Sequence, residues 1–308
     1  MIGAFLEWLA RHATKLLAGA VFLGLAIPPL ADLLRPGLTA FVVVNLVVAL
    51  LRLDLTEVRS YLNRPYLIGA NIVFLLLICP VAVSLIMQPF GLPPGLHAAV
   101  VLMAAAPPIM SAAAFALLLG LDAALAIFVV VATHAIVPFT LPVMALWLLG
   151  MDLDIGLAEL MLRLGLVIGI AFAIAFVIRK WLVSEAFLVR NARRIDGLAV
   201  IGLVYFATAI MAGVTEFAIA RPGYVLLTVT LAFVANGALQ LFGAVAFWKT
   251  GRRRALTVGL MAGNCNMGIL LATLLDTAPM DLVIYFAIAQ LPMYMLPLFA
   301  LPIYRRVI

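Results

Sequence analysis

The sequence has few charged residues: Asp, Glu, Lys and Arg together make up 10% of its 308 residues, whereas 67% are hydrophobic. A soluble domain is about half apolar and about a quarter charged, so this composition excludes a soluble globular protein. The sequence also lacks an HExxH motif, a nucleophile elbow, a phosphate loop and a carboxylate pair at a catalytic spacing. We therefore expect an integral membrane protein that is not an enzyme.

Cysteine is scarce as well. Cys79 and Cys265 both lie inside apolar runs, where a disulfide would require two closely opposed backbones. We predict two free thiols, no metal site and no cofactor.

The first fifteen residues, MIGAFLEWLARHATK, lack the uninterrupted apolar core of a signal peptide, because Glu7, Arg11 and Lys15 divide them. We interpret this stretch as an amphipathic helix that lies in the membrane interface.

Long hydrophobic runs occupy most of the chain. A hydrocarbon core about 30 Å thick requires roughly 20 apolar residues per helix. The polar connections are mostly shorter than about 15 residues, which leaves no room for a soluble domain. The sequence predicts an all-α membrane protein with ten transmembrane helices, over residues 16–34, 37–53, 66–88, 96–119, 123–149, 157–178, 197–215, 224–248, 255–275 and 280–303.

Lys and Arg are concentrated on one side of this topology, and the other side carries at most Arg35, Arg221 and Arg163. Cytoplasmic loops are the ones enriched in Lys and Arg. We therefore expect both termini in the cytoplasm, at a bacterial inner membrane, and we attribute the net charge of +6 to topology rather than to nucleic-acid binding. The basic side carries Arg11, Lys15, Arg52, Arg59, Arg64, Arg179, Lys180, Arg190, Arg193, Arg194, Lys249, Arg252, Arg253, Arg254, Arg305 and Arg306.

The two halves of the chain share a pattern of proline positions at offsets of 154 to 157 residues. Each half has five expected spans, an odd number, so the second copy would have the opposite orientation. We predict two inverted five-helix repeats, residues 1–155 and 156–308. The matches are Arg64-Pro65 with Arg221-Pro222, Pro138 with Pro292, and Pro142 with Pro297.

The expected fourth span contains two adjacent prolines, Pro107 and Pro108, in MAAAPPIMSAAAF. Proline removes a backbone donor and frees a carbonyl, which in hydrocarbon costs several kcal/mol unless another group bonds it. The expected ninth span has the glycine-punctuated stretch MAGNCNMGIL at the corresponding position. Two discontinuous helices in inverted halves indicate a transporter's binding site. A kink that only serves packing is the alternative for the fourth span.

The stretches APPIMSAAAFALLLGLDAALA and RRRALTVGLMAGNCNMGILLATLL resemble the fourth and ninth helices of the bile acid:sodium symporter superfamily, which includes arsenite exporters. The resemblance covers nearly the whole chain, with Pro80 in the third span and Asn236-Gly237 in the eighth. It implies a panel domain of spans one, two, six and seven and a core domain of spans three to five and eight to ten. It also implies that the core helices cross at their breaks, with substrate between the two domains.

This sequence departs from the family at the sodium ligands. A hard cation needs oxygen ligands, but the matching positions have no side-chain oxygen. Ser111, Asn264 and Thr133 lie one or a few positions away, and shifting the alignment restores no carboxylate. We therefore expect no sodium coupling. The degenerate positions are Leu75, Ala112, Ala113, Ala126, Val130, Met261 and Cys265.

A few polar residues remain near the breaks, and we predict that they bind the solute. His134 is ionisable, which inside a span makes it a candidate for proton coupling. The alternative is a neutral imidazole bonded to a carbonyl freed near Pro138. The amides of Asn264 and Asn266 either line the break or join helices. The predicted site comprises Pro107, Pro108, Ser111, Thr133, His134, Asn264, Cys265, Asn266 and Gln290.

We expect a secondary transporter for a small organic solute, anionic or amphipathic, in the lipid bilayer; the sequence sets no oligomeric state. The alternatives are a proton-coupled exchanger that uses His134 and a transport-inactive sensor or scaffold. Arsenite export would need a soft ligand such as Cys265. It is less favoured, because the exporters of that superfamily carry their cysteine on the fourth helix, where this chain has Met110 and Ser111.

Overall fold

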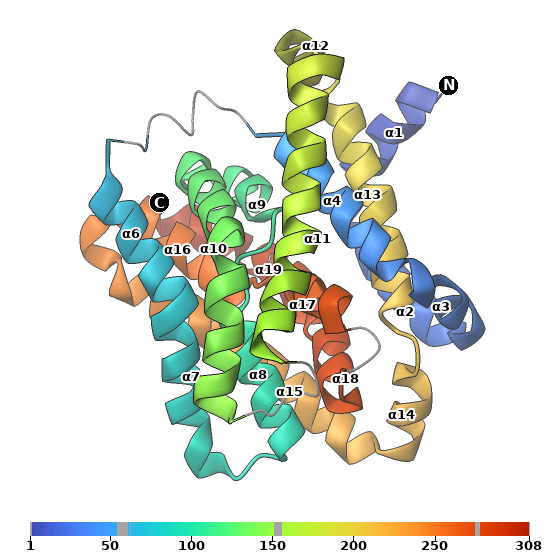
Figure 1. The fold of residues 1–308 in the computed structure, drawn as a ribbon, viewed down its shortest axis with the longest axis vertical. Coiled ribbons are helices and arrows are strands. Elements are labelled where there is room, and N and C mark those ends of the chain that lie inside the picture. Colours follow the sequence, from blue (N-terminus) through green and yellow to red (C-terminus); the bar gives the residue numbers. More distant parts are fainter. Residues whose placement is uncertain (1, 54–60, 62, 151–155, 275–277, 308) are drawn as a thin grey trace. The chain divides into compact units, whose positions relative to one another are not determined.

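The computed structural model describes residues 2–53, 61, 63–150, 156–274 and 278–307, and this part of the chain is all-helical. Helices satisfy their backbone hydrogen bonds internally, as a segment in lipid requires. The chain divides into two compact units (Figure 1). The first unit is Met1–Leu53 with Gly165–Leu226, and the second is Asp54–Leu164 with Leu227–Ile308.

The first unit is built around one helix, α13 (Ala192–Ala209), which packs against α1, α2, α3 and α4. Side chains of α13 and α14 donate to carbonyl groups at helix ends: the Tyr205 hydroxyl to Leu34 O (2.7 Å) and Thr215 Oγ1 to Leu25 O (2.7 Å). The helices that lie wholly in this unit are α1 (Ile2–Arg11), α2 (Ala13–Ala26), α3 (Pro28–Leu34), α4 (Leu38–Leu51), α12 (Glu185–Arg190), α13 and α14 (Val214–Ala220), with turns at Arg35–Gly37 and Ile178–Leu182.

The N-terminal region departs from the expected first span, residues 16–34. The helix α2 ends at Ala26 and α3 begins at Pro28, because a proline is favoured at the first position of a new helix. The continuous apolar segment is instead Pro28–Leu51. The helix α1 buries Leu9 and exposes Phe5 and Trp8, as the amphipathic pattern predicts.

The second unit contains the remaining helices, and α10 packs against α8, α9 and α16 within it. The helices α11 (Leu157–Val177) and α15 (Pro222–Ala246) belong partly to each unit. The helices that lie wholly in the second unit are α6 (Pro65–Val73), α7 (Cys79–Met87), α8 (Pro94–Ala105), α9 (Ala112–Leu118), α10 (Ala123–Leu149), α16 (Arg252–Gly263), α17 (Met267–Leu274), α18 (Met280–Ile288) and α19 (Gln290–Val307), with turns at Phe74–Ile78, Gln88–Phe90 and Trp248–Thr250.

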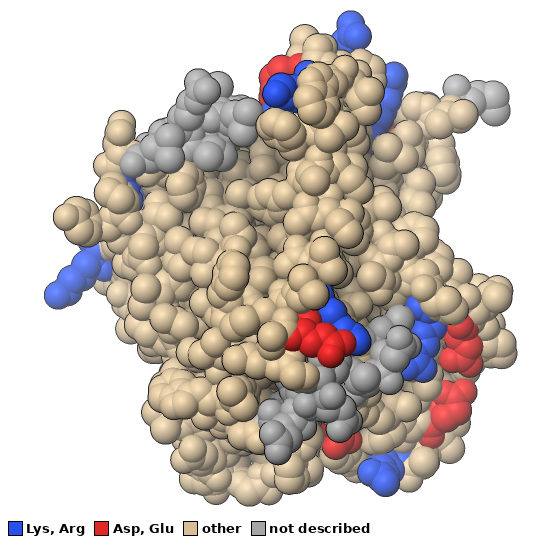
Figure 2. Space-filling view, in the orientation of Figure 1, with Lys and Arg blue, Asp and Glu red and all other residues tan. Residues whose placement is uncertain are grey.

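Seven helices among the described residues are long and apolar enough to cross a membrane, or eight if the bent pair Ile2–Arg11 and Lys15–Ala26 counts as one span. This number is below the ten expected, partly because the expected fourth and ninth spans each consist of two short helices. Large apolar side chains face outward on α11, at Leu162, Leu166 and Ile170. The face shown in Figure 2 carries few charges, in keeping with an apolar solvent around these helices.

Glycines bring α15 and α16 into close contact inside the second unit. A Cβ on Gly259 would lie 2.3 Å from Gln240 O, and one on Gly263 would lie 2.6 Å from Asn236 O. Small residues at such positions let helix backbones approach each other in membrane proteins. This approach places the Asn236 side chain beside the C-terminus of α16.

Candidate functional site

Two helices of the second unit are interrupted where the sequence predicts. The helix α8 ends at Ala105 and α9 begins at Ala112, with Pro107 and Pro108 between them. The helix α16 ends at Gly263 and α17 begins at Met267. The predicted interruptions are therefore confirmed, and a packing kink in a continuous helix is excluded for the fourth expected span.

The two breaks are hydrogen bonded to each other. Ile109 N donates to Asn264 O (2.8 Å), and Asn266 N donates to Pro107 O (2.6 Å). Pro108 and Cys265 thereby form an antiparallel β-bridge. Each break satisfies backbone groups that the other has lost from its helix, which removes the cost of unpaired groups in an apolar interior.

His134 on α10 reaches one of the breaks. Its Nδ1 lies 2.8 Å from Val130 O, one turn earlier, and its Nε2 lies 3.2 Å from Asn266 Nδ2. His134 is fully buried, whereas Asn266 is partly exposed. The carbonyl it bonds is that of Val130 and not the one freed by Pro138, which belongs to His134 itself. Thr133, next to it, donates to Val129 O (2.7 Å) and Val130 O (2.9 Å) within its own helix.

Asn236 on α15 bonds the end of α16. Its Nδ2 donates to Gly263 O (2.6 Å), the last carbonyl before the break, and its Oδ1 accepts from Gln240 Nε2 (2.7 Å). The final carbonyl groups of a helix have no partner inside the helix. Asn236 thus supplies a hydrogen-bond donor to Gly263 O, which lipid could not supply.

The other predicted site residues make local contacts. Asn264 Nδ2 donates to Leu260 O (2.8 Å), and Gln290 Nε2 donates to Phe286 O (3.1 Å). Their side-chain oxygens are buried without a partner among the described residues. Cys265 is a free thiol, as is Cys79, which confirms that prediction. Ser111 precedes α9 but its hydroxyl does not cap that helix.

The positions that we expect to match the family's sodium ligands form part of a packed apolar interior. Leu75 lies in a π-helical turn, Phe74–Ile78, which ends just before Pro80 and in which Cys79 N donates to Phe74 O. Ala113 is partly buried. The other positions are no more than 3% exposed: Leu75, Ala112, Ala126, Val130, Met261 and Cys265.

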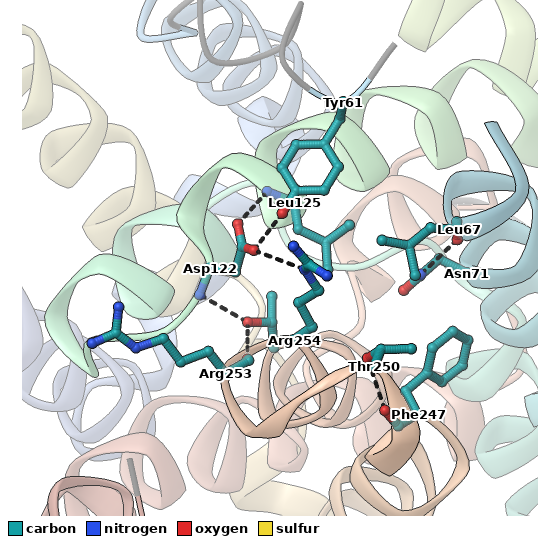
Figure 3. A network of polar contacts seen from close by, with 10 residues as sticks. Tyr61, Leu67, Asn71, Asp122, Leu125, Phe247, Thr250, Arg253 and Arg254 are labelled. Carbon is teal, nitrogen blue, oxygen red and sulfur yellow. Dashed lines mark hydrogen bonds and ion pairs between the residues drawn. The ribbon is translucent and has the colours of Figure 1, made fainter. Parts of the chain in front are cut away.

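A polar network at the start of α10 was not predicted from the sequence (Figure 3). Asp122 Oδ1 accepts from Leu125 N (3.0 Å) and so caps α10, and Asp122 N donates to Thr257 Oγ1 on α16 (3.0 Å). Asp122 Oδ2 accepts from the Tyr61 hydroxyl and lies 3.6 Å from Arg254 Nε. Asp before an apolar helical run is a cap signal, but its partners on α16 and at Tyr61 are far away in sequence.

The electrostatics of this network act on Tyr61, which lies outside the apolar spans. Burial raises the pKa of Tyr61, and the hydrogen bond to Asp122 together with its negative charge raises that pKa further. Arg254 opposes both effects. Tyr61 therefore stays a neutral hydroxyl donor to Asp122 at neutral pH, which ties α16, the start of α10 and the segment before α6 together.

Apolar helices and two interrupted helices joined at their breaks define an integral membrane protein of the secondary-transporter class. Residues 39–221, more than half of the chain, match the profile of the Sodium Bile acid symporter family, and the chain belongs to this family. This confirms the resemblance seen in the sequence. The protein is thus a membrane transporter of the sodium bile acid symporter type, for a small-molecule solute. A search of curated proteins finds no match.

Proposed function

We propose that this protein is a secondary transporter of a small organic anion or amphipathic solute, which binds at the two breaks, and that it is not driven by sodium. The observation that carries the proposal is the backbone pairing of Pro107 and Ile109 with Asn264 and Asn266 in a chain of this family. Breaks of this kind bring backbone dipoles and amide side chains together in an otherwise apolar interior.

The proposed architecture is that of the family. The first unit contains the residues of spans one, two and seven and most of six, and it would be the panel domain. The second unit contains the residues of spans three to five, nine and ten and most of eight, and it would be the core domain. Each half of the chain, 1–155 and 156–308, would then be one inverted repeat of five spans, with both termini in the cytoplasm at a bacterial inner membrane. The two broken helices and the helices with internal prolines, α10 and α19, support this repeat.

Sodium independence follows from the chemistry of the expected ligand positions. A site for a hard cation requires several oxygen ligands, and a buried cation needs a counter-charge. The matching positions carry only alkyl, thioether and thiol groups, including Ala112, Met261 and Cys265. They are closely packed and present no anionic oxygen.

The test is uptake into proteoliposomes of a panel of organic anions, including taurocholate and benzoate. Each solute is measured with an inward sodium gradient, with an inward proton gradient and with neither, against liposomes without protein. We expect protein-dependent uptake that a sodium gradient does not increase. Accumulation driven by sodium would contradict the proposed coupling. Ligand-induced thermal stabilisation without uptake of any solute would favour a sensor over a transporter.

A further inference from the structure

The hydrogen bonds of His134 define which ring nitrogen carries hydrogen. Nδ1 lies 2.8 Å from Val130 O, and a carbonyl oxygen can only accept, so Nδ1 must be protonated. In the neutral ring, Nε2 is then an acceptor, and it receives a hydrogen bond from Asn266 Nδ2 at 3.2 Å. Both ring nitrogens are thereby satisfied in a fully buried imidazole.

A second proton on His134 would reverse this pairing. Protonated Nε2 becomes a donor and would face the Asn266 amide nitrogen, which is also a donor. Turning the side-chain amide over brings Oδ1 to the imidazolium and moves the NH2 group to the other side. The Asn266 backbone stays in place during this turn, because its N–H bonds Pro107 O across the breaks. Since Asn266 is partly exposed, its outward group changes from an acceptor to a donor.

Within the described part of the chain, the elements packed against α10 offer an imidazolium at His134 no carboxylate. Its two nitrogens already bond Val130 and Asn266. The described elements packed against α10 contain no Asp or Glu. A buried cation without a counter-charge is disfavoured, so a bound anion would supply what the protein lacks. The titratable side chains on those elements and in the break are Tyr66, Cys79, His97, Arg252, Arg253, Arg254 and Cys265.

We infer that His134 and Asn266 couple anion binding to the uptake of one proton, so that anion and proton are carried together. This rests on the proposed function, because the solute must bind at the breaks. The proton comes from water, adds to His134 Nε2 when the anion binds, and returns to water on the other side when the anion leaves. The turned Asn266 amide donates N–H to the anion, and linkage makes the effect reciprocal: each ligand strengthens binding of the other.

The hydrogen-bond arrangement is tested without any solute. Nitrogen-15 NMR of labelled histidine in a His12→Gln/His97→Gln background reports His134 alone. We expect the neutral ring at about pH 8 to carry its hydrogen on Nδ1 with an acceptor Nε2. In Asn266→Asp, a carboxylate beside the ring should hold His134 in its protonated form at a pH at least one unit higher than in the background protein. Hydrogen on Nε2 in the neutral ring, or an unchanged titration in Asn266→Asp, would overturn the proposal.

The coupling is tested by binding of taurocholate and benzoate to the purified protein in nanodiscs, with proton uptake followed by a pH-sensitive dye. We expect about one proton taken up per anion bound, and a Kd that rises about tenfold per pH unit between the titration of the free protein and that of the anion-bound protein. His134→Gln should abolish the pH dependence, whereas His97→Gln should keep it. Anion binding that is independent of pH would contradict this proposal alone. Failure of both anions to bind at any pH would contradict the proposed function as well.

Discussion

Two buried asparagines of the second unit should respond in opposite directions to the same substitution. Asn236 is 2% exposed and bonds Gly263 O at the break, whereas Asn71 is fully buried and bonds Leu67 O within its own helix (2.8 Å). Leucine removes the amide at either position. We expect Asn236→Leu to destabilise the protein and Asn71→Leu to leave its stability unchanged or higher.

The magnitudes follow from the partners that remain. Without Asn236, Gly263 O loses its donor in an apolar interior and the partly exposed Gln240 loses its acceptor. Each buried group left unpaired costs about 1–3 kcal/mol, which gives a loss of about 3 kcal/mol. Leu67 O can keep its helical backbone bond when Asn71 is replaced, and the substitution removes Oδ1, a buried acceptor without a partner among the described residues. That change should be worth a gain of about 1 kcal/mol.

The measurement is the free energy of unfolding in mixed detergent micelles, titrated with SDS and extrapolated linearly, for the wild type and both variants. Leucine introduces a similar change of volume and polarity at both sites, so the difference between the variants isolates the role of the hydrogen-bond partner. We expect the two variants to differ by about 4 kcal/mol. Equal losses, or a larger loss in Asn71→Leu, would refute the argument that Asn236 satisfies the break.

Two further predictions concern the helices around the site. Gly259→Ala should destabilise the protein by about 2 kcal/mol, because the new Cβ would lie 2.3 Å from Gln240 O, a backbone atom. Gly237→Ala is the control: its Cβ meets open space, so this variant should be neutral or stabilising. Thermal unfolding of both variants measures the difference, and equal shifts of the melting temperature would contradict the prediction. The raised pKa of Tyr61 implies stability that is present below about pH 10 and lost as the pH rises through its folded value. Melting curves from about pH 8 to 11 should therefore show an advantage of the wild type over Tyr61→Phe that shrinks above about pH 10, and a constant advantage would contradict the assignment.

Much of the fold could be predicted from the sequence, because each backbone group in lipid needs a hydrogen-bond partner within the protein. Pro107 and Pro108 cannot continue a helix, and the structure interrupts α8 and α9 at these residues. The second break was predicted from glycines and amides, and it lies at Asn264–Asn266 as expected. The same rule applies at Pro28, where a new helix begins inside the span expected over residues 16–34. The apolar run continues across Pro28, so hydrophobicity alone does not predict this helix boundary.

The hydrogen-bond partners that lie far apart in the sequence could not be predicted in this way. Ile109 N pairs with Asn264 O, and Asn266 N with Pro107 O, so the register of the breaks depends on how α8 and α16 are packed. The Asp122 network has the same origin: Thr257 and Arg254 reach Asp122 because α10 packs against α16. The sequence shows which polar group needs a hydrogen-bond partner, but tertiary packing decides which residue supplies that partner.

The chemistry that holds the breaks together is separate from the chemistry expected to bind sodium. Backbone pairing between the breaks and the Asn236 bond to Gly263 O use amide groups, and these persist here. Ala112 and Met261, two of the positions expected to match the family's ion ligands, are fully buried apolar side chains. Replacing a buried polar side chain by an apolar one removes the polar atoms and also their need for hydrogen-bond partners, so it lowers the stability of the protein little. If sodium coupling is absent, as we propose, the paired breaks persist without an ion site, and His134 with Asn266 is the polar pair that we propose to carry a proton instead.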